Sequence, residues 1–240
     1  MLFRRVVIYA LLIGAASGAL WTVAQFWQVI PIIQKAEQFE GHHALPVDDG
    51  HPDHDHAAEA WAPGDGVERT FYTLVANVLT AVGLAMVLLV AVVATLRVRP
   101  GTRVDWRYGL LWGAAGYVVF FLAPALGLPP EIPGATAAPL QERQLWWLMT
   151  VTLTAAGLAG VAFGKTPWRW AALGLLAVPH LIGAPEPPAL FGGQSPSAVA
   201  ELTKLARQFI GATALANAVL WLALGLASVW AARRIVSTSE

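Results

Sequence analysis

Residues Thr70–Leu96 read TFYTLVANVLTAVGLAMVLLVAVVATL, a stretch without a single Asp, Glu, Lys, Arg or His. An α-helix needs about 20 consecutive apolar residues to cross the roughly 30 Å hydrocarbon core of a bilayer, so this stretch predicts a transmembrane helix. Comparable stretches occur before and after it, and the six expected helices are Val6–Ile33, Thr70–Leu96, Tyr108–Leu128, Leu145–Gly164, Trp168–Ala184 and Leu205–Ala231. We therefore predict an all-α membrane protein that forms a single transmembrane domain over residues 1–240.

The composition supports this class and excludes several others. Of the 240 residues, 57% are hydrophobic and 12% are charged, whereas soluble domains carry about 25% charged residues. Lys+Arg 15 equals Asp+Glu 15, so there is no basic surplus for nucleic acid, and Cys 0 excludes thiolate metal sites and cysteine nucleophiles. The glycines of Gly160–Thr166 have one residue too few between them for a nucleotide-binding loop. We expect no nucleotide, no cofactor and no enzymatic activity.

Lys and Arg residues predict the orientation in the membrane. If the N-terminus is cytoplasmic, the cytoplasmic segments hold ten of the 15 Lys and Arg residues, and all but two of the 15 acidic residues lie outside. An excess of Lys and Arg on cytoplasmic segments is the usual pattern. We therefore expect both termini in the cytoplasm of a multi-pass membrane protein. One long polar outer loop, residues 34–69, then follows the first helix.

A weak internal repeat suggests three helical hairpins. Trp106-Arg107-Tyr108 opens the third helix and Trp168-Arg169-Trp170 opens the fifth, and each of these helices ends in a stretch rich in Pro. An arginine stands where each chain returns from outside, at Arg69, Arg143 and Arg207. Coincidence among apolar segments is the alternative explanation. We interpret the three arginines as structural anchors that pair with outer acidic residues.

The distribution of histidine is the strongest functional signal. Five of the 6 His fall within the outer loop, interleaved with aspartates. Imidazole and carboxylate together suit divalent transition metals, so we predict that this loop captures metal ions. A solvated acidic loop without metal is the alternative. The expected ligands are His42, His43, His51, Asp53, His54, Asp55 and His56.

Three more residues are candidates for handling the ion beyond the loop. Glu37 and Glu40 are three residues apart at the end of the first helix, where they would share one helical face. They either relay an ion to the membrane or only keep the helix end hydrated. His180, beside Pro179, is the one histidine at membrane depth. Ionisable groups there are functional candidates by default, although a histidine at the interface is the simpler alternative.

Several long strings then identify a family resemblance. They are Ala36-Glu37 with Phe39-Glu40, Trp61-Ala62-Pro63 with Asp65-Gly66-Val67-Glu68-Arg69-Thr70, Leu122-Ala123-Pro124-Ala125-Leu126-Gly127-Leu128-Pro129-Pro130-Glu131, Arg143-Gln144-Leu145-Trp146-Trp147, and Pro179-His180-Leu181-Ile182-Gly183-Ala184-Pro185. In this order over nearly the full length, they resemble the CbtA family of cobalt transporter subunits. The resemblance implies an inner-membrane protein that serves cobalt uptake and cobalamin supply. It also implies a small one-helix partner subunit, CbtB.

These observations together predict an uptake subunit for a divalent transition metal. We expect Co²⁺ as the transported ion, with Ni²⁺ as the alternative. In this hypothesis the outer loop captures the ion, Glu37 and Glu40 relay it, and a pore opens near His180, Glu131 and Glu186. Two other functions remain open at this point: a non-conducting metal-binding subunit that docks to a partner, and efflux of nickel or cobalt.

Overall fold

A computed structural model describes residues 2–39, 63–187 and 189–237, and every regular element in these ranges is a helix. This confirms the predicted all-α class. In chain order the elements are α1 (Leu2–Glu37), α2 (Val67–Val98), α3 (Trp106–Tyr117), the π-helical turn η1 (Val118–Leu122), α4 (Ala123–Ala125), α5 (Leu140–Phe163), α6 (Trp168–Ile182) and α7 (Pro196–Ser237).

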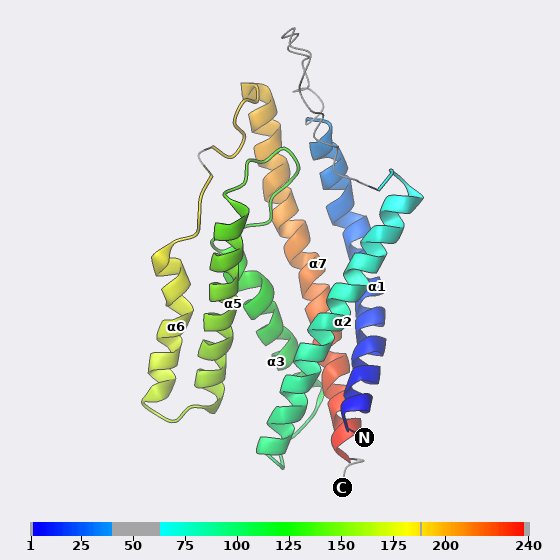
Figure 1. The fold of residues 1–240 in the computed structure, drawn as a ribbon, viewed down its shortest axis with the longest axis vertical. Coiled ribbons are helices and arrows are strands. Elements are labelled where there is room, and N and C mark those ends of the chain that lie inside the picture. The colour runs from blue at the N-terminus through cyan, green and yellow to red at the C-terminus, as the bar shows by residue number, and fades with distance from the viewer. Residues whose placement is uncertain (1, 40–62, 188, 238–240) are drawn as a thin grey trace, which may run out of the picture.

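The helices form an elongated bundle whose two described chain ends lie together (Figure 1). α1, α2 and α7 pack against one another, and α3 packs on α7. α6 packs on α5, and this pair contacts the rest through η1 and α4 at one side of the bundle (Figure 1). We call the end away from the chain termini the outer end. α1 ends there, and α2, α5 and α7 begin there.

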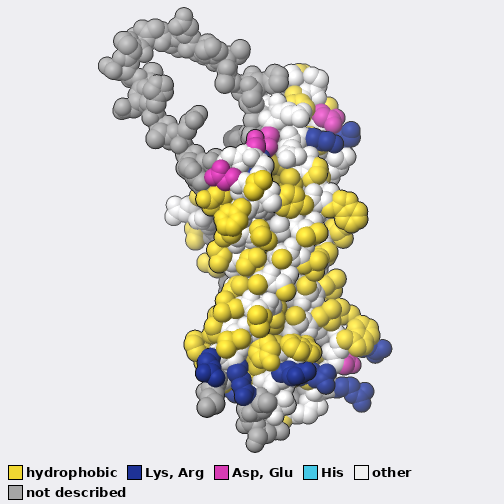
Figure 2. All heavy atoms as spheres, turned by 90° about the vertical axis from the view of Figure 1, so that its right-hand side faces the viewer, with side chains coloured by type: hydrophobic (Ala, Val, Ile, Leu, Met, Phe, Trp, Pro, Cys, Tyr) yellow, Lys and Arg dark blue, Asp and Glu magenta, His cyan; other side chains and the backbone are white. Residues whose placement is uncertain are grey.

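The surface carries the pattern of a membrane-spanning protein. Figure 2 shows a broad apolar belt around the middle, with most Lys and Arg side chains below it at the end of the chain termini and most acidic side chains above it. Five segments are long and apolar enough to cross a membrane: α1, α2, Trp106–Ala125, α5 and α7. The chain is therefore a multi-pass membrane protein.

The fifth predicted helix falls short of that length. α6 has 15 residues, which at about 1.5 Å each span roughly 22 Å. It ends at Gly183, whose φ of 88° lies in the region that favours glycine. The described residues that follow, 183–187 and 189–195, contain no helix, and α7 begins after them at the outer end (Figure 1).

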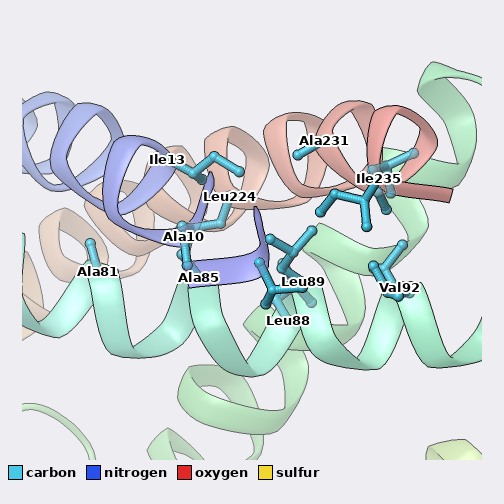
Figure 3. Close-up of a cluster of buried hydrophobic side chains, with 14 of the residues drawn as sticks. Ala10, Ile13, Ala81, Ala85, Leu88, Leu89, Val92, Leu224, Ala231 and Ile235 are labelled. Carbon is cyan, nitrogen blue, oxygen red and sulfur yellow. The ribbon is translucent and has the colours of Figure 1, made fainter. Parts of the chain in front are cut away.

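The core of the bundle consists mainly of alanine and branched aliphatic side chains. One buried cluster joins α1, α2 and α7 in the half nearer the chain termini, and Figure 3 shows its members interleaving between the three helices. Ala10, Ala81 and Ala85 are fully buried there. Such small side chains allow helix backbones to approach closely, which is the main source of packing energy between helices in lipid.

The pairing of helices differs from the three expected hairpins. α1 and α2 do pack as a pair, but α6 packs on α5 and has no comparable contact with α7 in the described part of the chain. The expected hairpin of the fifth and sixth helices is therefore wrong. The physical reason is the extended segment after α6, which separates that helix from α7.

Two helix boundaries also differ from those expected. The sequence predicts that the sixth helix begins at Leu205, but α7 already begins at Pro196. The Ser195 hydroxyl accepts a hydrogen bond from the Ala198 N–H at 3.3 Å, so a serine cap followed by proline starts the helix. The start of the outer loop also shifts, because Glu37 is the last residue of α1.

Two prolines near the ends of the third and fifth expected helices lie within helical segments. Pro124 follows the wide turn η1, and the helix continues to Ala125. A π-turn relieves the clash that a proline ring makes with the carbonyl four residues earlier. Pro179 lies inside α6, which continues to Ile182. The helices are thus distorted or ended shortly afterwards, and neither proline is itself the break.

Candidate functional site

A polar cleft of about 690 Å³ lies between α1, α2 and α7 near the outer end. We call it the outer cleft. On α1, its lining runs from Gln25 up to Glu37, which corresponds to about 18 Å along a helix axis. The residues that line it are Gln25, Phe26, Val29, Ile30, Ile33, Gln34, Glu37, Asp65, Gly66, Arg69, Thr70, Thr73, Phe209 and Thr213.

Arg69 joins two carboxylates at the mouth of the outer cleft. Its guanidinium forms a bidentate pair with Glu37, with one of the two bonds, from Nη1 to Oε2, at 3.1 Å. The same Nη1 donates to Asp65 Oδ1 at 3.2 Å. Glu37 and Arg69 are each about one-third exposed, whereas the Asp65 side chain is 93% exposed. Because arginine stays protonated in proteins, these three groups together carry a net charge of −1.

A hydrogen-bonded cluster of neutral polar side chains closes the deep end of the cleft. The Asn77 side-chain amide donates to Gln25 Oε1 at 2.8 Å and to Thr22 Oγ1 at 3.0 Å. Thr22 in turn donates to the Gly18 carbonyl at 2.8 Å. Asn77 and Thr22 are buried, while Gln25 lines the cleft. Asn77 on α2 thus bonds across to α1.

Thr213 on α7 adds a further polar group to the cleft wall. Its hydroxyl is buried and has no hydrogen-bond partner in the described part of the chain. Buried polar groups normally have a partner, so an unpaired one invites an explanation, such as ordered water. The same region thus contains an unpaired hydroxyl, a charged mouth and a polar floor.

Segments that are far apart in the sequence also come together around Trp146 on α5. Its indole N–H donates to the Pro179 carbonyl at 3.3 Å, and its ring meets His180 edge-on with 6.0 Å between ring centroids. A Cβ added at Gly127 would overlap the indole ring and lie 3.0 Å from Ala184 Cβ. We call this group the Trp146 junction. It joins the end of α4, α5 and the end of α6.

The expected role of the arginines as anchors is confirmed for two of the three. Arg143 Nη2 pairs with Glu131 Oε2 at 2.8 Å, and Arg69 pairs with Glu37 and Asp65. The acidic residues directly before them, Glu68 and Glu142, are not the partners. Arg207 is exposed and forms no ion pair with residues that the structure describes.

The predicted site residues have different outcomes. Glu37 is at the mouth of the outer cleft, whereas His180 does not line it and is exposed near the end of α6, a helix on the other side of the bundle from α1 and α2 (Figure 1). No group of three or more potential metal ligands occurs among the described residues. The following predicted ligands lie outside the described residues: Glu40, His42, His43, His51, Asp53, His54, Asp55 and His56.

The proposed pore near His180 gains no geometric support. Glu131 is occupied by Arg143, and Glu186 is exposed on the segment after α6. The residues of the outer cleft were mostly missed from the sequence. Thr22 and Gln25 are three residues apart on an apolar helix, so they share a face. That spacing of polar groups was the available signal.

Residues from the sequence stretches that resemble the family come together at the mouth of the outer cleft and at the Trp146 junction. Glu37, Asp65 and Arg69 come together at the cleft mouth, although they stand on either side of the outer loop. Gly127, Trp146 and Pro179 come together at the Trp146 junction. A family model described as "Probable cobalt transporter subunit (CbtA)" matches residues 3–233. No curated protein and no solved structure matches the chain.

Proposed function

The chain belongs to the CbtA family of probable cobalt transporter subunits, and on that premise we propose that it carries Co²⁺ inward across a bacterial inner membrane. In this proposal both termini are cytoplasmic, and the outer end of the bundle faces away from the cytoplasm. The resemblance to the family also supplies the second part of the proposal, a small one-helix subunit of the CbtB type as partner.

One observation supports this proposal in addition to the family membership. The segment that contains the five clustered histidines follows Glu37 and precedes Asp65 in the sequence, and both of these residues line the outer cleft. His42 is five residues from Glu37, so chain length alone keeps their Cα atoms within about 18 Å of each other. A metal ion captured by the loop histidines and aspartates would therefore be released next to the cleft, with Glu37 and Glu40 as relays.

The membrane potential supplies enough energy for this direction. A unit charge that moves down 100 mV gains about 2.3 kcal/mol, so a divalent cation gains roughly 4.6 kcal/mol. That free energy corresponds to accumulation on the order of a thousandfold. The acidic outer end favours inward movement as well, because it raises the local concentration of cations.

α6 is where we place the partner subunit. It packs only on α5 among the described elements, and Trp168, Trp170 and Leu181 on it are more than 70% exposed. His180 is exposed on the same helix. An imidazole at membrane depth is costly without a hydrogen-bond partner. A transmembrane helix that covers α6 could offer that partner.

A non-conducting docking subunit is the second candidate function. The observation that favours it is the apolar core of α1, α2 and α7, which closes the bundle below the outer cleft. In that case the loop and cleft would hold metal for a partner that conducts it.

Proteoliposomes that contain this protein alone test the proposal. We expect Co²⁺ uptake that grows with an inside-negative potential, with Ni²⁺ as the stronger competitor compared with Zn²⁺. Alanine at all five loop histidines should raise the apparent KM and leave the maximal rate unchanged. The matched control carries five substitutions at apolar residues of the same segment. A lack of uptake with and without the partner would exclude conduction and leave the docking function.

A further inference from the structure

The outer cleft has a floor and a mouth but no exit, and we propose that it is an aqueous vestibule that binds a hydrated divalent cation in an outward-facing state of the protein. The contact of α1 with α2 below Gln25 is the closed inner barrier. This inference deepens the proposed function and rests on it for the identity of the ion as Co²⁺.

The size of the outer cleft suits an ion that keeps its water. A water molecule in liquid occupies about 30 Å³, so a cation with six waters needs on the order of 200 Å³. The cleft volume of about 690 Å³ exceeds this requirement. Small divalent cations give up their waters reluctantly and are often bound through them. The vestibule therefore needs few direct protein ligands, which agrees with the lack of a ready three-ligand group among the described residues.

The chemistry of the walls suits the same occupant. Glu37 and Asp65 supply charge at the mouth, and Gln25, Thr73 and Thr213 supply neutral oxygen atoms deeper in the cleft. Groups of this kind accept hydrogen bonds from the water shell of a cation. Thr213 is the member with a buried, unpaired hydroxyl. Water that enters the cleft with the ion explains how this group is satisfied.

Arg69 lowers the net negative charge at the mouth of the outer cleft. It bridges Glu37 on α1 and Asp65 before α2, so it occupies the position between the two carboxylates. A divalent cation that binds both carboxylates must displace the guanidinium. The bridge therefore ties α1 to the segment before α2 at the mouth, and the three groups keep a net charge of −1 that attracts cations.

Close backbone packing seals the vestibule below its floor. A Cβ added at Gly18 would lie 2.6 Å from Val78 Cα and 2.8 Å from the Asn77 carbonyl oxygen, and one at Gly14 would overlap the Val82 backbone. The apolar cluster of α1, α2 and α7 continues from there (Figure 3). A hydrated ion does not pass such a contact. Inward release therefore requires α1 and α2 to separate along this glycine face.

The simplest competing explanation is that the polar groups only hold the helices together. Hydrogen bonds between side chains of membrane helices do so, with about 0.6 kcal/mol each on average. This explanation predicts a dry interface, whereas a vestibule predicts water at Gln25 and Thr73. Access of a water-soluble reagent separates the two.

The test uses single cysteines, because the chain contains no cysteine of its own. Gln25→Cys and Thr73→Cys probe the outer cleft, and Val23→Cys and Leu79→Cys, at positions that are each 66% exposed on the same helices, probe the lipid-facing surface. A membrane-impermeant methanethiosulfonate is added to right-side-out vesicles. The cleft positions should react at least about tenfold faster, because the reactive thiolate forms where water reaches the sulfur. Size-exclusion profiles verify that each variant is folded.

Two further arms complete the experiment. In inside-out vesicles, Gln25→Cys and Thr73→Cys should stay unlabelled because of the inner barrier. Millimolar Co²⁺ should slow labelling of Thr73→Cys several-fold more than monovalent salt of equal ionic strength, and Glu37→Gln should reduce this protection. Equal rates at cleft and lipid-facing positions, labelling from the inner side, or no protection by Co²⁺ would each overturn the inference. If these arms succeed while uptake fails, the vestibule stands and the proposed conduction does not.

Discussion

Gly14 and Gly18 set the distance between α1 and α2, and with it the seal below the outer cleft. Both residues face α2, and an added Cβ at either position would collide with α2 backbone atoms. Gly113 and Gly225 play the same part between α3 and α7, where a Cβ on Gly225 would lie 2.6 Å from Gly113 Cα. Membrane helices gain their packing energy from such close approach, since burial of apolar surface offers little gain in lipid.

Alanine at Gly14 should therefore be destabilising although alanine is the better helix former. We expect the free energy of unfolding to fall by about 1–3 kcal/mol, the usual cost of overpacking a tight contact. The matched control is Gly83→Ala on α2, because a Cβ at Gly83 meets nothing within 4 Å. That variant should be unchanged or gain up to about 1 kcal/mol. Thermal unfolding of the purified protein in detergent, followed by size-exclusion chromatography, measures both. Equal stability of the two variants would contradict the packing argument.

The Trp146 junction connects the peripheral pair α5 and α6 to the rest of the bundle. Trp146 is 5% exposed, whereas its neighbour Trp147 is 39% exposed. Its ring lies against Gly127 after α4, and its N–H bonds to the Pro179 carbonyl inside α6. Arg143, one turn earlier on α5, forms an ion pair with Glu131 in the segment between α4 and α5. One face of α5 thus fixes two other segments of the chain.

Removal of this indole should loosen three elements at once. Trp146→Ala should lower the free energy of unfolding by roughly 3–5 kcal/mol, as expected for a buried Trp that leaves a cavity. Trp147→Ala, at the adjacent and more exposed position, should cost less than half as much. Heating curves in detergent give the comparison, and limited proteolysis should show cleavage after α4 and after α6 only in Trp146→Ala. If both variants lose the same stability, Trp146 has no special role at the junction.

At this scale, the sequence predicts where helices lie better than how they pair. The spans followed from the length of apolar stretches, and five of the six expected spans have helices long enough to cross a membrane. The first turns of α7 were missed because Glu201 and Lys204 make them polar, although Ser195-Pro196 marks their start. The pairing of α6 with α5 depends on the path of residues 183–195, which have no periodic pattern to interpret.

The candidate site was predictable only in part for a related reason. Glu37 stood out because it is charged at the end of an apolar helix, but its partner Arg69 is 32 residues away in sequence. Glu68 and Glu142, the acidic neighbours in sequence, turned out to be the wrong partners for the arginines. Local spacing identifies residues that share a helical face, whereas contacts between helices depend on packing that a single sequence does not specify.

At the scale of the whole molecule, the positions of the chain ends bear on the number of membrane crossings. Both described chain ends lie at the same end of the bundle (Figure 1), and in the proposed orientation, with both termini cytoplasmic, the chain crosses the membrane an even number of times. Among the described residues, five segments are long and apolar enough to cross alone. We therefore propose α6, together with residues 183–187 and 189–195, as the sixth crossing. Irregular backbone at membrane depth is tolerated only where protein covers it. Two contacts tie this segment to the protein, since Phe191 is 8% exposed and the Leu190 carbonyl accepts a bond from the Thr136 N–H at 2.8 Å, whereas more than half of its described residues are exposed.

Reporter fusions test whether α6 and this segment form a crossing. Green fluorescent protein fused after Lys165 or at the C-terminus should fluoresce in a bacterial host, because Lys and Arg gather at that end (Figure 2) and such ends stay in the cytoplasm. Alkaline phosphatase, which is active only outside the cytoplasm, should be active when fused after Leu190 and inactive after Lys165. An inactive fusion after Leu190 would mean that α6 returns to the side on which it began. The C-terminus would then lie opposite the N-terminus, and an odd number of crossings would contradict the even-numbered bundle.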